Sequence, residues 1–476
     1  MTASSEFCFL SATELARRIR VRDVSAQEVV STHLTQIERI NPQVNAIVTL
    51  VAEQAMMQAK QADERQARGE SLGALHGLPV VHKDLVETKG IRTTFGSPIF
   101  KDFVPNRSAL IVERLQQAGA ITLGKSNTPE FGAGSQTFNE VFGETLNPFG
   151  LPDRRLTCGG SSGGAAVALA CGMVPLADGS DLGGSLRNPA SFCNVVGLRP
   201  SSGRVPNWPA LAAWFPFSVV GPMARNVSDI ALMMSAIAGP DARSPISLPE
   251  PGALFSQPLA RDFKNVRIAW SPDLNGAYHI DPAVTNVLKK QLSTFETLGC
   301  VIEETAPDLN GADAVFRTWR AWAMHMNFAD LYKTHRHQMK DTVVWNIEAG
   351  AKLTGADLAR AEKLRTELYH RVYAFMNDYE FLIMPVVQVL PFDVSKRWVD
   401  EINGVTLPTY LDWMKSCYLI SATGLPCISV PAGFSGDGLP VGLQIVGRHQ
   451  ADFSVLQMAY AFEQATQFGM RRPAII

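Results

Sequence analysis

The sequence has little excess charge of either sign and no long uninterrupted apolar run. Its 476 residues carry 43 Lys and Arg against 45 Asp and Glu, a formal net charge of −2. Without a basic excess to neutralise phosphates, we expect no nucleic-acid partner. Because no run of 18 residues is apolar without a Gly or Pro, and residues 1–10 lack a signal-peptide pattern, we expect neither a membrane span nor secretion.

Cysteine is scarce and unpatterned. The seven cysteines are odd in number, widely spaced and free of any CxxC pair, so the sequence indicates neither a disulfide framework nor a zinc site. We therefore expect a reducing, cytoplasmic location. Composition is that of a globular enzyme, with 46% hydrophobic residues to fill a core.

Strand and helix patterns alternate through the first half of the chain. The apolar stretch 78–81 predicts a buried strand that delivers His82, Lys83 and Asp84 to its carboxyl edge. A helical pattern over 109–118 precedes an apolar strand at 120–123, and 165–171 predicts a helix of small residues. Such alternation indicates α/β layers.

A glycine-crowded tract between Cys158 and Pro206 is the most informative feature. Eight glycines lie within residues 159–184, although each Gly inside a helix or strand costs about 0.5–1 kcal/mol relative to Ala. So many glycines indicate that the backbone must approach something closely. Ser161 and Ser185 lie in this tract.

Together with Lys83, this tract resembles the amidase signature family, most strongly over residues 77–239. A second stretch, 424–442, is similar to the family's C-terminal pattern. The resemblance implies one domain over 1–476 with a three-layer α/β/α fold and a large mixed β-sheet. It divides into N-terminal helices (1–72), the signature core (73–239), a variable substrate-selecting part (250–420) and a C-terminal return to the core (421–476).

The resemblance also assigns chemistry to three side chains. Ser185 would be the nucleophile, Ser161 a bridging serine preceded by a cis peptide bond, and Lys83 the base behind it. Their separations, 78 and 24 residues, fit the family pattern. The implied reaction is hydrolysis of a carboxylic amide through an acyl-serine, with esters as further candidate substrates and no metal or organic cofactor.

Lys83 can act as a base only when neutral. Its pKa would have to move from about 10.4 to about 7–8, which corresponds to roughly 4 kcal/mol. Burial away from carboxylates would achieve this. The neighbouring Asp84 should point to the opposite face of the strand and support structure elsewhere.

The backbone N–H groups of Leu182, Gly183, Gly184 and Ser185 are the expected oxyanion hole, because two glycines let a carbonyl oxygen lie against the main chain. The flanking charged residues, Asp181 and Arg187, should fix this loop without touching substrate.

Residues 119–126 satisfy the G-x-x-x-x-G-K-S pattern of a phosphate-binding loop. A genuine loop of that kind follows a strand and opens a helix. Here a helical stretch precedes the pattern and its four intervening residues resemble the strand, so we expect no nucleotide site around Lys125.

The substrate pocket is less determined. Asn188 stands where the family has an apolar or aromatic residue, and either shapes the pocket or caps the turn before Pro189. Trp214 and Phe215 are candidate pocket residues, and the abundant aromatic residues favour a substrate with a hydrophobic or aryl portion.

The alternative function is the glutaminase (A) subunit of a tRNA-dependent amidotransferase, which shares the signature. That subgroup carries an aspartate in a segment that is here 217–221, Phe-Ser-Val-Val-Gly, without one. A free-standing amidase with a small-molecule amide substrate is therefore favoured, and a homodimer is left open.

Overall fold

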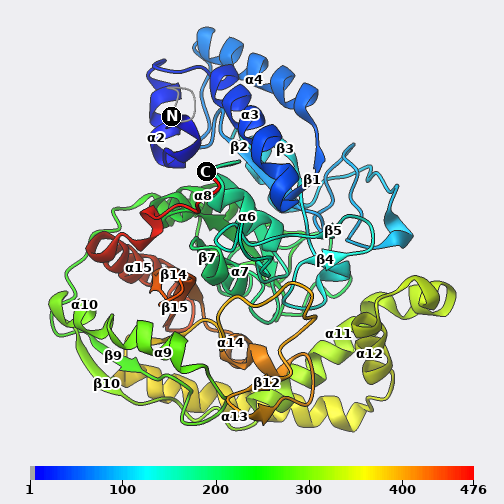
Figure 1. The fold of residues 1–476 in the computed structure, drawn as a ribbon, viewed down its shortest axis with the longest axis vertical. Helices are drawn as coiled ribbons and strands as arrows, with labels where there is room; N and C mark the ends of the chain where they lie inside the picture. Colours follow the sequence, from blue (N-terminus) through cyan, green and yellow to red (C-terminus); the bar gives the residue numbers. More distant parts are fainter. Residues whose placement is uncertain (1–5) are drawn as a thin grey trace.

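An eleven-stranded mixed β-sheet forms the centre of the computed structural model, which describes residues 6–476 (Figure 1). β2 runs parallel to β3 and β6, and β9 runs parallel to β10 and β11, whereas the other neighbours are antiparallel. The predicted mixed sheet is confirmed. Its strands lie in the order β1 (Ile47–Leu50), β3 (Ile121–Ser126), β2 (Pro79–Lys83), β6 (Leu176–Asp181), β8 (Val219–Ala224), β7 (Val196–Arg199), β14 (Cys427–Phe434), β15 (Pro440–Gly447), β11 (Phe381–Pro385), β9 (Arg267–Trp270) and β10 (Val301–Glu304).

Helices cover both faces of this sheet. Successive strand residues enter different apolar cores, as Val80 and Val81 of β2 do, so the α/β/α layering is confirmed. One core contains α3 (Ala26–Val44), α4 (Ala52–Ala67), α6 (Gly163–Ala170), α7 (Arg187–Phe192), α11 (Ala312–His335), α13 (Gly355–Asp378) and α14 (Lys415–Thr423). The other contains α2 (Ala12–Arg20), α5 (Leu110–Gln117), α8 (Val227–Ile237), α9 (Pro282–Lys289), α10 (Leu292–Thr297) and α15 (Asp452–Thr466).

Small elements complete the chain. α12 (Asp341–Ala351) packs against α11 around a third, smaller apolar core, at the lower right of Figure 1. Two short antiparallel pairs lie outside the large sheet: β4 (Phe138–Asn139) with β5 (Gly143–Glu144), and β12 (Glu401–Ile402) with β13 (Val405–Thr406).

Local sequence explains the elements that carry the site. Every residue of β2 is buried, in keeping with its apolar start, and Lys83 is its last residue. All eight residues of α6 are buried as well. A Cβ added to Gly164 of α6 would lie 2.3 Å from the Asn127 backbone N, so only a small-residue helix fits against this part of the sheet. This close packing places Ser161 and Ser162 at the start of α6, beside the carboxyl end of β2.

Each of the four predicted segments contributes strands to the one sheet: β1 from the N-terminal part, β2, β3, β6, β7 and β8 from the signature core, β9, β10 and β11 from the variable part, and β14 and β15 from the C-terminal part. We therefore propose a single domain. The chain ends also meet, since the Arg472 guanidinium lies 4.0 Å from the centre of the Phe9 ring.

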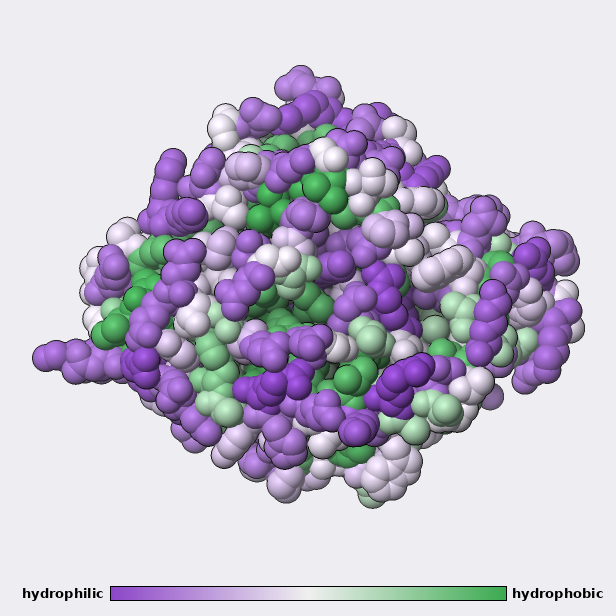
Figure 2. All heavy atoms as spheres, turned by 90° about the horizontal axis from the view of Figure 1, so that it is seen from below, coloured by the Kyte–Doolittle hydropathy of each residue, from purple (hydrophilic) through white to green (hydrophobic). Residues whose placement is uncertain are grey.

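Across residues 6–476, the helices are too short or too polar to cross a membrane. The face seen in Figure 2 is mainly hydrophilic, and its hydrophobic residues form separate small groups.

Candidate active site

Lys83 lies fully buried at the carboxyl end of β2, where its ammonium nitrogen meets three hydroxyl groups. Its Nζ is 2.7 Å from Ser161 Oγ, 2.9 Å from Ser162 Oγ and 3.1 Å from Ser180 Oγ. No carboxylate of residues 6–476 forms an ion pair with it. The structure thus joins Lys83 to Ser161, as the sequence predicted, and adds Ser162 and Ser180, which sequence reasoning treated as ordinary turn residues.

The electrostatic surroundings favour a neutral lysine. Burial lowers the pKa of Lys83 to about 7, against the opposing attraction of Asp181 and Asp178. Asp84 points elsewhere, as expected: its carboxylate accepts hydrogen bonds from the N–H and the hydroxyl of Thr94. A lysine with this pKa exchanges protons near neutral pH, which suits a base.

Asp178 of β6 fixes the strand that carries Lys83. Its Oδ1 accepts the Lys83 backbone N–H at 2.8 Å, and its Oδ2 lies 2.5 Å from His82 Nδ1. The other ring nitrogen of His82 is 3.0 Å from Thr122 Oγ1 on β3. Sequence reasoning missed this residue, although a carboxylate within a strand of small residues was the available signal, because a buried carboxylate needs partners.

The loop between β6 and α7 is held in shape by Asp181. This carboxylate accepts hydrogen bonds from the Gly184 N–H (2.8 Å) and the Leu186 N–H (3.1 Å), and it pairs with Arg187 at 3.0 Å. The predicted role of Asp181 and Arg187 in fixing the loop agrees with these contacts. The Gly184 N–H is occupied by Asp181, which removes it from the predicted oxyanion donors because one N–H cannot serve both groups well.

The three remaining predicted donors are the N–H groups of Leu182, Gly183 and Ser185. None has an acceptor among the residues that the structure describes. Leu182, Gly183 and Ser185 also line the same cavity. The arrangement leaves three backbone donors available to a ligand oxygen beside the Ser185 hydroxyl.

Two buried arginines balance Asp181. Arg187 and Arg199 both contact its Oδ1 at 3.0 Å. Burial alone would raise the pKa of Asp181, but the two guanidinium groups outweigh it and hold that pKa well below its ordinary value. The loop that carries Ser185 therefore rests on a buried, permanently charged cluster.

A cavity of about 770 Å³ brings the two serines together. Ser161 and Ser185 both line it, and the Ser162 N–H donates to the Ser185 carbonyl at 3.2 Å. The peptide bond between Gly160 and Ser161 is cis, as the resemblance implied. The cavity wall is rich in aromatic rings, namely Phe95, Phe100, Phe131, Trp208, Phe215, Phe316 and Phe328.

Of the three predicted pocket residues, the structure places only Phe215 in the cavity wall. Trp214 points outward, with 75% of its surface exposed. Asn188 is buried outside the wall, and its Oδ1 accepts the Gly160 N–H at 3.3 Å. Asn188 therefore supports the glycine tract, which is a correction to its proposed contact with substrate.

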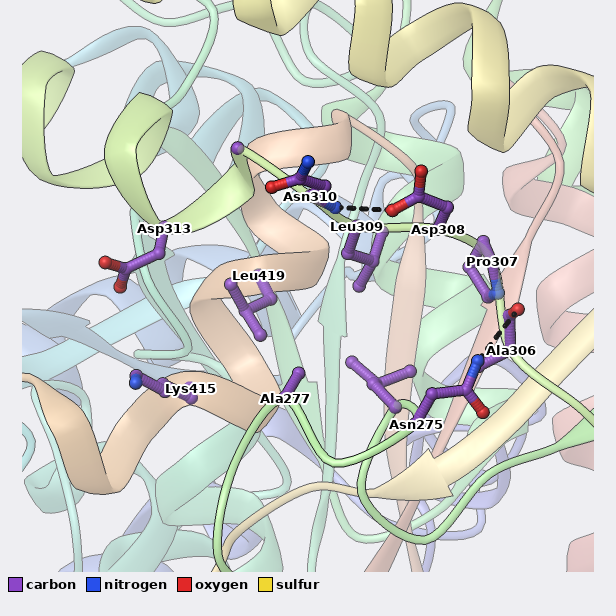
Figure 3. Close-up of a pocket in the computed structure, with 12 residues that line it drawn as sticks. Asn275, Ala277, Ala306, Pro307, Asp308, Leu309, Asn310, Asp313, Lys415 and Leu419 are labelled. Carbon is purple, nitrogen blue, oxygen red and sulfur yellow. Dashed lines mark hydrogen bonds between the residues drawn. The ribbon is translucent and has the colours of Figure 1, made fainter.

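A second, smaller cavity of about 440 Å³ lies behind the catalytic loop. Lys415 and Leu419 of α14 line it, whereas Cys417, on the opposite face of that helix, packs against Gly184. Figure 3 shows Asp313 and Lys415 on one side of this space and Asn275 and Pro307 on the other. It contains none of the three candidate catalytic side chains.

The nucleotide-loop pattern is not a nucleotide site in the structure. Residues Ile121–Ser126 form strand β3, and Lys125 is buried with its Nζ on the Thr88 and Thr93 hydroxyls and the Val86 carbonyl. Lys125 holds the segment after β2 in place. Residues 6–476 also contain no cluster of three or more His, Cys, Asp or Glu that could hold a metal ion.

Comparison with known proteins gives one consistent result. The Amidase family model matches residues 28–456. The chain belongs to the amidase family. An acylamidase from Rhodococcus erythropolis is 37% identical, with 98% of this chain and 97% of the relative aligned. One of the subunits of a glutamyl-tRNA(Gln) amidotransferase, from Moorella thermoacetica, is 35% identical, with 99% of each chain aligned.

Structural comparison agrees. The crystal structure of a bacterial aryl acylamidase of the amidase signature family superposes with a TM-score of 0.90 at 29% identity, covering 97% of this chain and 98% of that one. The family and the fold together make this protein an amidase, a hydrolase of carboxylic amides.

Proposed function

We propose that the protein hydrolyses amides with a hydrophobic or aryl portion through an acyl-Ser185 intermediate. One observation carries the proposal: the Lys83 ammonium nitrogen lies 2.7 Å from Ser161 Oγ, and Ser161 shares a cavity with Ser185. Lysine, bridging serine and nucleophilic serine together provide a route for the proton that Ser185 must lose.

In the proposed mechanism, Ser185 Oγ attacks the carbonyl carbon while its proton passes to Ser161, whose own proton passes to neutral Lys83. The N–H groups of Leu182, Gly183 and Ser185 stabilise the oxyanion. The C–N bond then breaks as the proton returns through Ser161 to the leaving amine. Water attacks the acyl-Ser185 ester by the same proton route in reverse, which releases the carboxylate and restores the hydroxyl of Ser185.

The aromatic wall supports a hydrophobic or aryl portion in the substrate. Phe131 and Phe328 stack with their ring centres 4.3 Å apart, and Phe215 lies in the same wall. A flat apolar group gains both area burial and ring contacts in such a site. Similarity to an aryl acylamidase supports the same substrate class.

The alternative, a glutaminase subunit of a tRNA-dependent amidotransferase, is supported by the relative from Moorella thermoacetica. Against it, Ser218 lines the cavity in the segment where that subgroup has an aspartate. Among the described residues, the one acidic side chain in the cavity wall is Glu87, which is already paired with Arg107 at 2.7 Å. A substrate ammonium group such as that of glutamine therefore has little to bind.

A substrate panel tests the proposal. Ammonia or amine release is measured from aliphatic amides, aryl amides, anilides and glutamine, with wild-type protein and Ser185→Ala side by side. The proposal expects turnover of the aryl substrates that is lost in Ser185→Ala. Turnover of glutamine alone favours the amidotransferase function, and activity that persists in Ser185→Ala shows that Ser185 is not the nucleophile.

Two further parts of the proposal concern the protein in the cell. We propose a cytoplasmic location, supported by seven cysteines that are all unpaired thiols. Homodimer formation stays a prediction, which light scattering on the purified protein tests.

A further inference from the structure

Arg320 of α11 is a buried cation in the wall of the large cavity. It is 8% exposed and lines the same space as Ser185. Its Nε donates to Asn346 Oδ1 at 3.2 Å and its Nη2 donates to the Tyr410 hydroxyl at 2.9 Å. Both partners are neutral, and Nη1 has no acceptor among residues 6–476.

The charge of Arg320 is not balanced by a neighbouring carboxylate. Other cations of this region have acidic partners: Arg317 pairs with Asp412 at 2.6 Å, and Arg397 pairs with Glu144 at 3.2 Å. No such ion pair exists for Arg320 within residues 6–476. A buried guanidinium without a counter-charge is costly to the fold, and such a cost is retained where a ligand supplies the missing charge.

The position of Arg320 relates it to the reacting group. Phe316, one helical turn earlier on α11, packs against the oxyanion loop, since a Cβ on Gly183 would lie 2.7 Å from the Phe316 ring. Four residues of helix correspond to a rise of about 6 Å. Arg320 therefore lies about one turn farther along the cavity wall, within reach of a substituent on a small amide bound at Ser185.

Arg320 is also held in a fixed orientation. The Tyr410 hydroxyl accepts a second hydrogen bond from Asn346 Nδ2 at 2.6 Å, so Asn346 and Tyr410 brace each other as well as the guanidinium. Arginine binds carboxylates through two parallel N–H···O bonds, and a braced guanidinium loses little freedom when it does so.

We propose that Arg320 forms an anion subsite that selects amides bearing a carboxylate, on either the acyl or the amine portion, in addition to the apolar group in the aromatic wall. This inference rests on the proposed function, because it assumes that amides bind beside Ser185. Glutamine is not the substrate it favours, since Glu87, the one acidic group that the described residues place in the wall, is already occupied by Arg107.

Matched substrate pairs test the subsite. Acetanilides with a meta or para carboxylate, and phenylacetamides with a para carboxylate, are compared with analogues in which a methyl ketone replaces the carboxylate. In wild-type protein, kcat/KM should favour the carboxylate at least tenfold in one of the two series, because a charge-assisted hydrogen bond contributes about 1.5–3 kcal/mol. Arg320→Gln should abolish that preference while leaving the ketone substrates within a few-fold, and Arg320→Lys should restore part of it.

Arg107→Met is the matched control, because Arg107 lines the same cavity but is already paired with Glu87. It should leave the carboxylate preference unchanged. Equal loss on carboxylate and ketone substrates in Arg320→Gln would show that Arg320 only ties α11 to its neighbours. No carboxylate preference in the wild type would overturn the subsite outright.

A binding measurement separates failure of the subsite from failure of the proposed function. Calorimetry with the Ser185→Ala protein compares 1,4-phenylenediacetate with 4-methylphenylacetate. The diacid should bind at least tenfold more tightly, and adding Arg320→Gln should remove that difference. Equal affinities would contradict the subsite even if the enzyme hydrolyses amides, whereas tighter diacid binding without turnover would retain the subsite and reject the proposed reaction.

Discussion

Replacing Lys83 with methionine should abolish activity and at the same time stabilise the fold. The Lys83 side chain is fully buried on three hydroxyl groups, and burial lowers its pKa to about 7. In the unfolded chain the same lysine has a pKa of about 10.4. The difference corresponds to roughly 4–5 kcal/mol, at about 1.4 kcal/mol per pH unit, by which burial disfavours the charged form.

This cost depends on pH in a defined direction. The unfolded chain holds a proton on Lys83 that the folded chain lacks between about pH 7 and 10.4, so the cost is full below pH 7 and disappears as pH rises through that window. Lys83→Met removes the charge and keeps most of the apolar stem. We expect its melting temperature to exceed that of the wild type by a few degrees at pH 7, with a smaller gain at pH 9.

Activity should change in the opposite sense. Without the base, kcat/KM for an aryl amide should fall at least about 10³-fold, within the range that general-base catalysis contributes. In the wild type, kcat/KM should decrease about tenfold per pH unit below a midpoint near pH 7, as Lys83 becomes protonated. Amine release over pH 5–9 and thermal unfolding followed by circular dichroism measure the two effects.

Lys125→Met provides the matched control. Lys125 is equally buried, on the neighbouring strand β3, and burial lowers its pKa to about 8, but its ammonium group contacts neither Ser161 nor Ser185. It should retain activity within about tenfold of the wild type. If Lys83→Met keeps more than a tenth of wild-type activity, or loses no more than Lys125→Met, Lys83 is not the base.

Two further substitutions test the loop that carries Ser185. Asp181→Asn removes the carboxylate that Arg187 and Arg199 share, and leaving two buried cations without it should destabilise the protein by about 3–5 kcal/mol, visible as a lower melting temperature; an unchanged melting temperature would contradict the buried cluster. Gly184→Ala places a Cβ 2.5 Å from the Cys417 Cβ at a backbone φ of +122°, and should lower kcat/KM at least about 10²-fold by displacing the N–H donors; retention of full activity would show that the loop position is not critical.

Sequence patterns predicted the parts of the site that lie close to regular structure. The apolar stretch before His82 correctly placed Lys83 at the carboxyl end of a buried strand, and the phosphate-loop pattern was correctly rejected because its middle residues form β3. The glycine tract indicated close backbone approach, and the contact that a Cβ on Gly184 would make bears this out.

Contacts between distant segments could not be predicted in the same way. Ser180 and Ser162 reach Lys83 only because β6 and α6 pack beside β2, and a serine among glycines carries no local sign of such a role. Asn188 looked like a pocket residue because it lies close to Ser185 in sequence, but α7 turns it toward Gly160. Arg320 belongs to the variable part, where the sequence offers neither motif nor spacing.

The most direct test of the account is detection of the acyl-enzyme. Wild-type protein is mixed with an activated aryl ester whose acyl group hydrolyses slowly, quenched in acid and digested, and the peptides are analysed by mass spectrometry. The account predicts an added acyl mass on Ser185, absent in Ser185→Ala. Acylation of Ser161 instead, or turnover without any acylated peptide, would contradict the central claim that Ser185 is the nucleophile activated through Ser161 and Lys83.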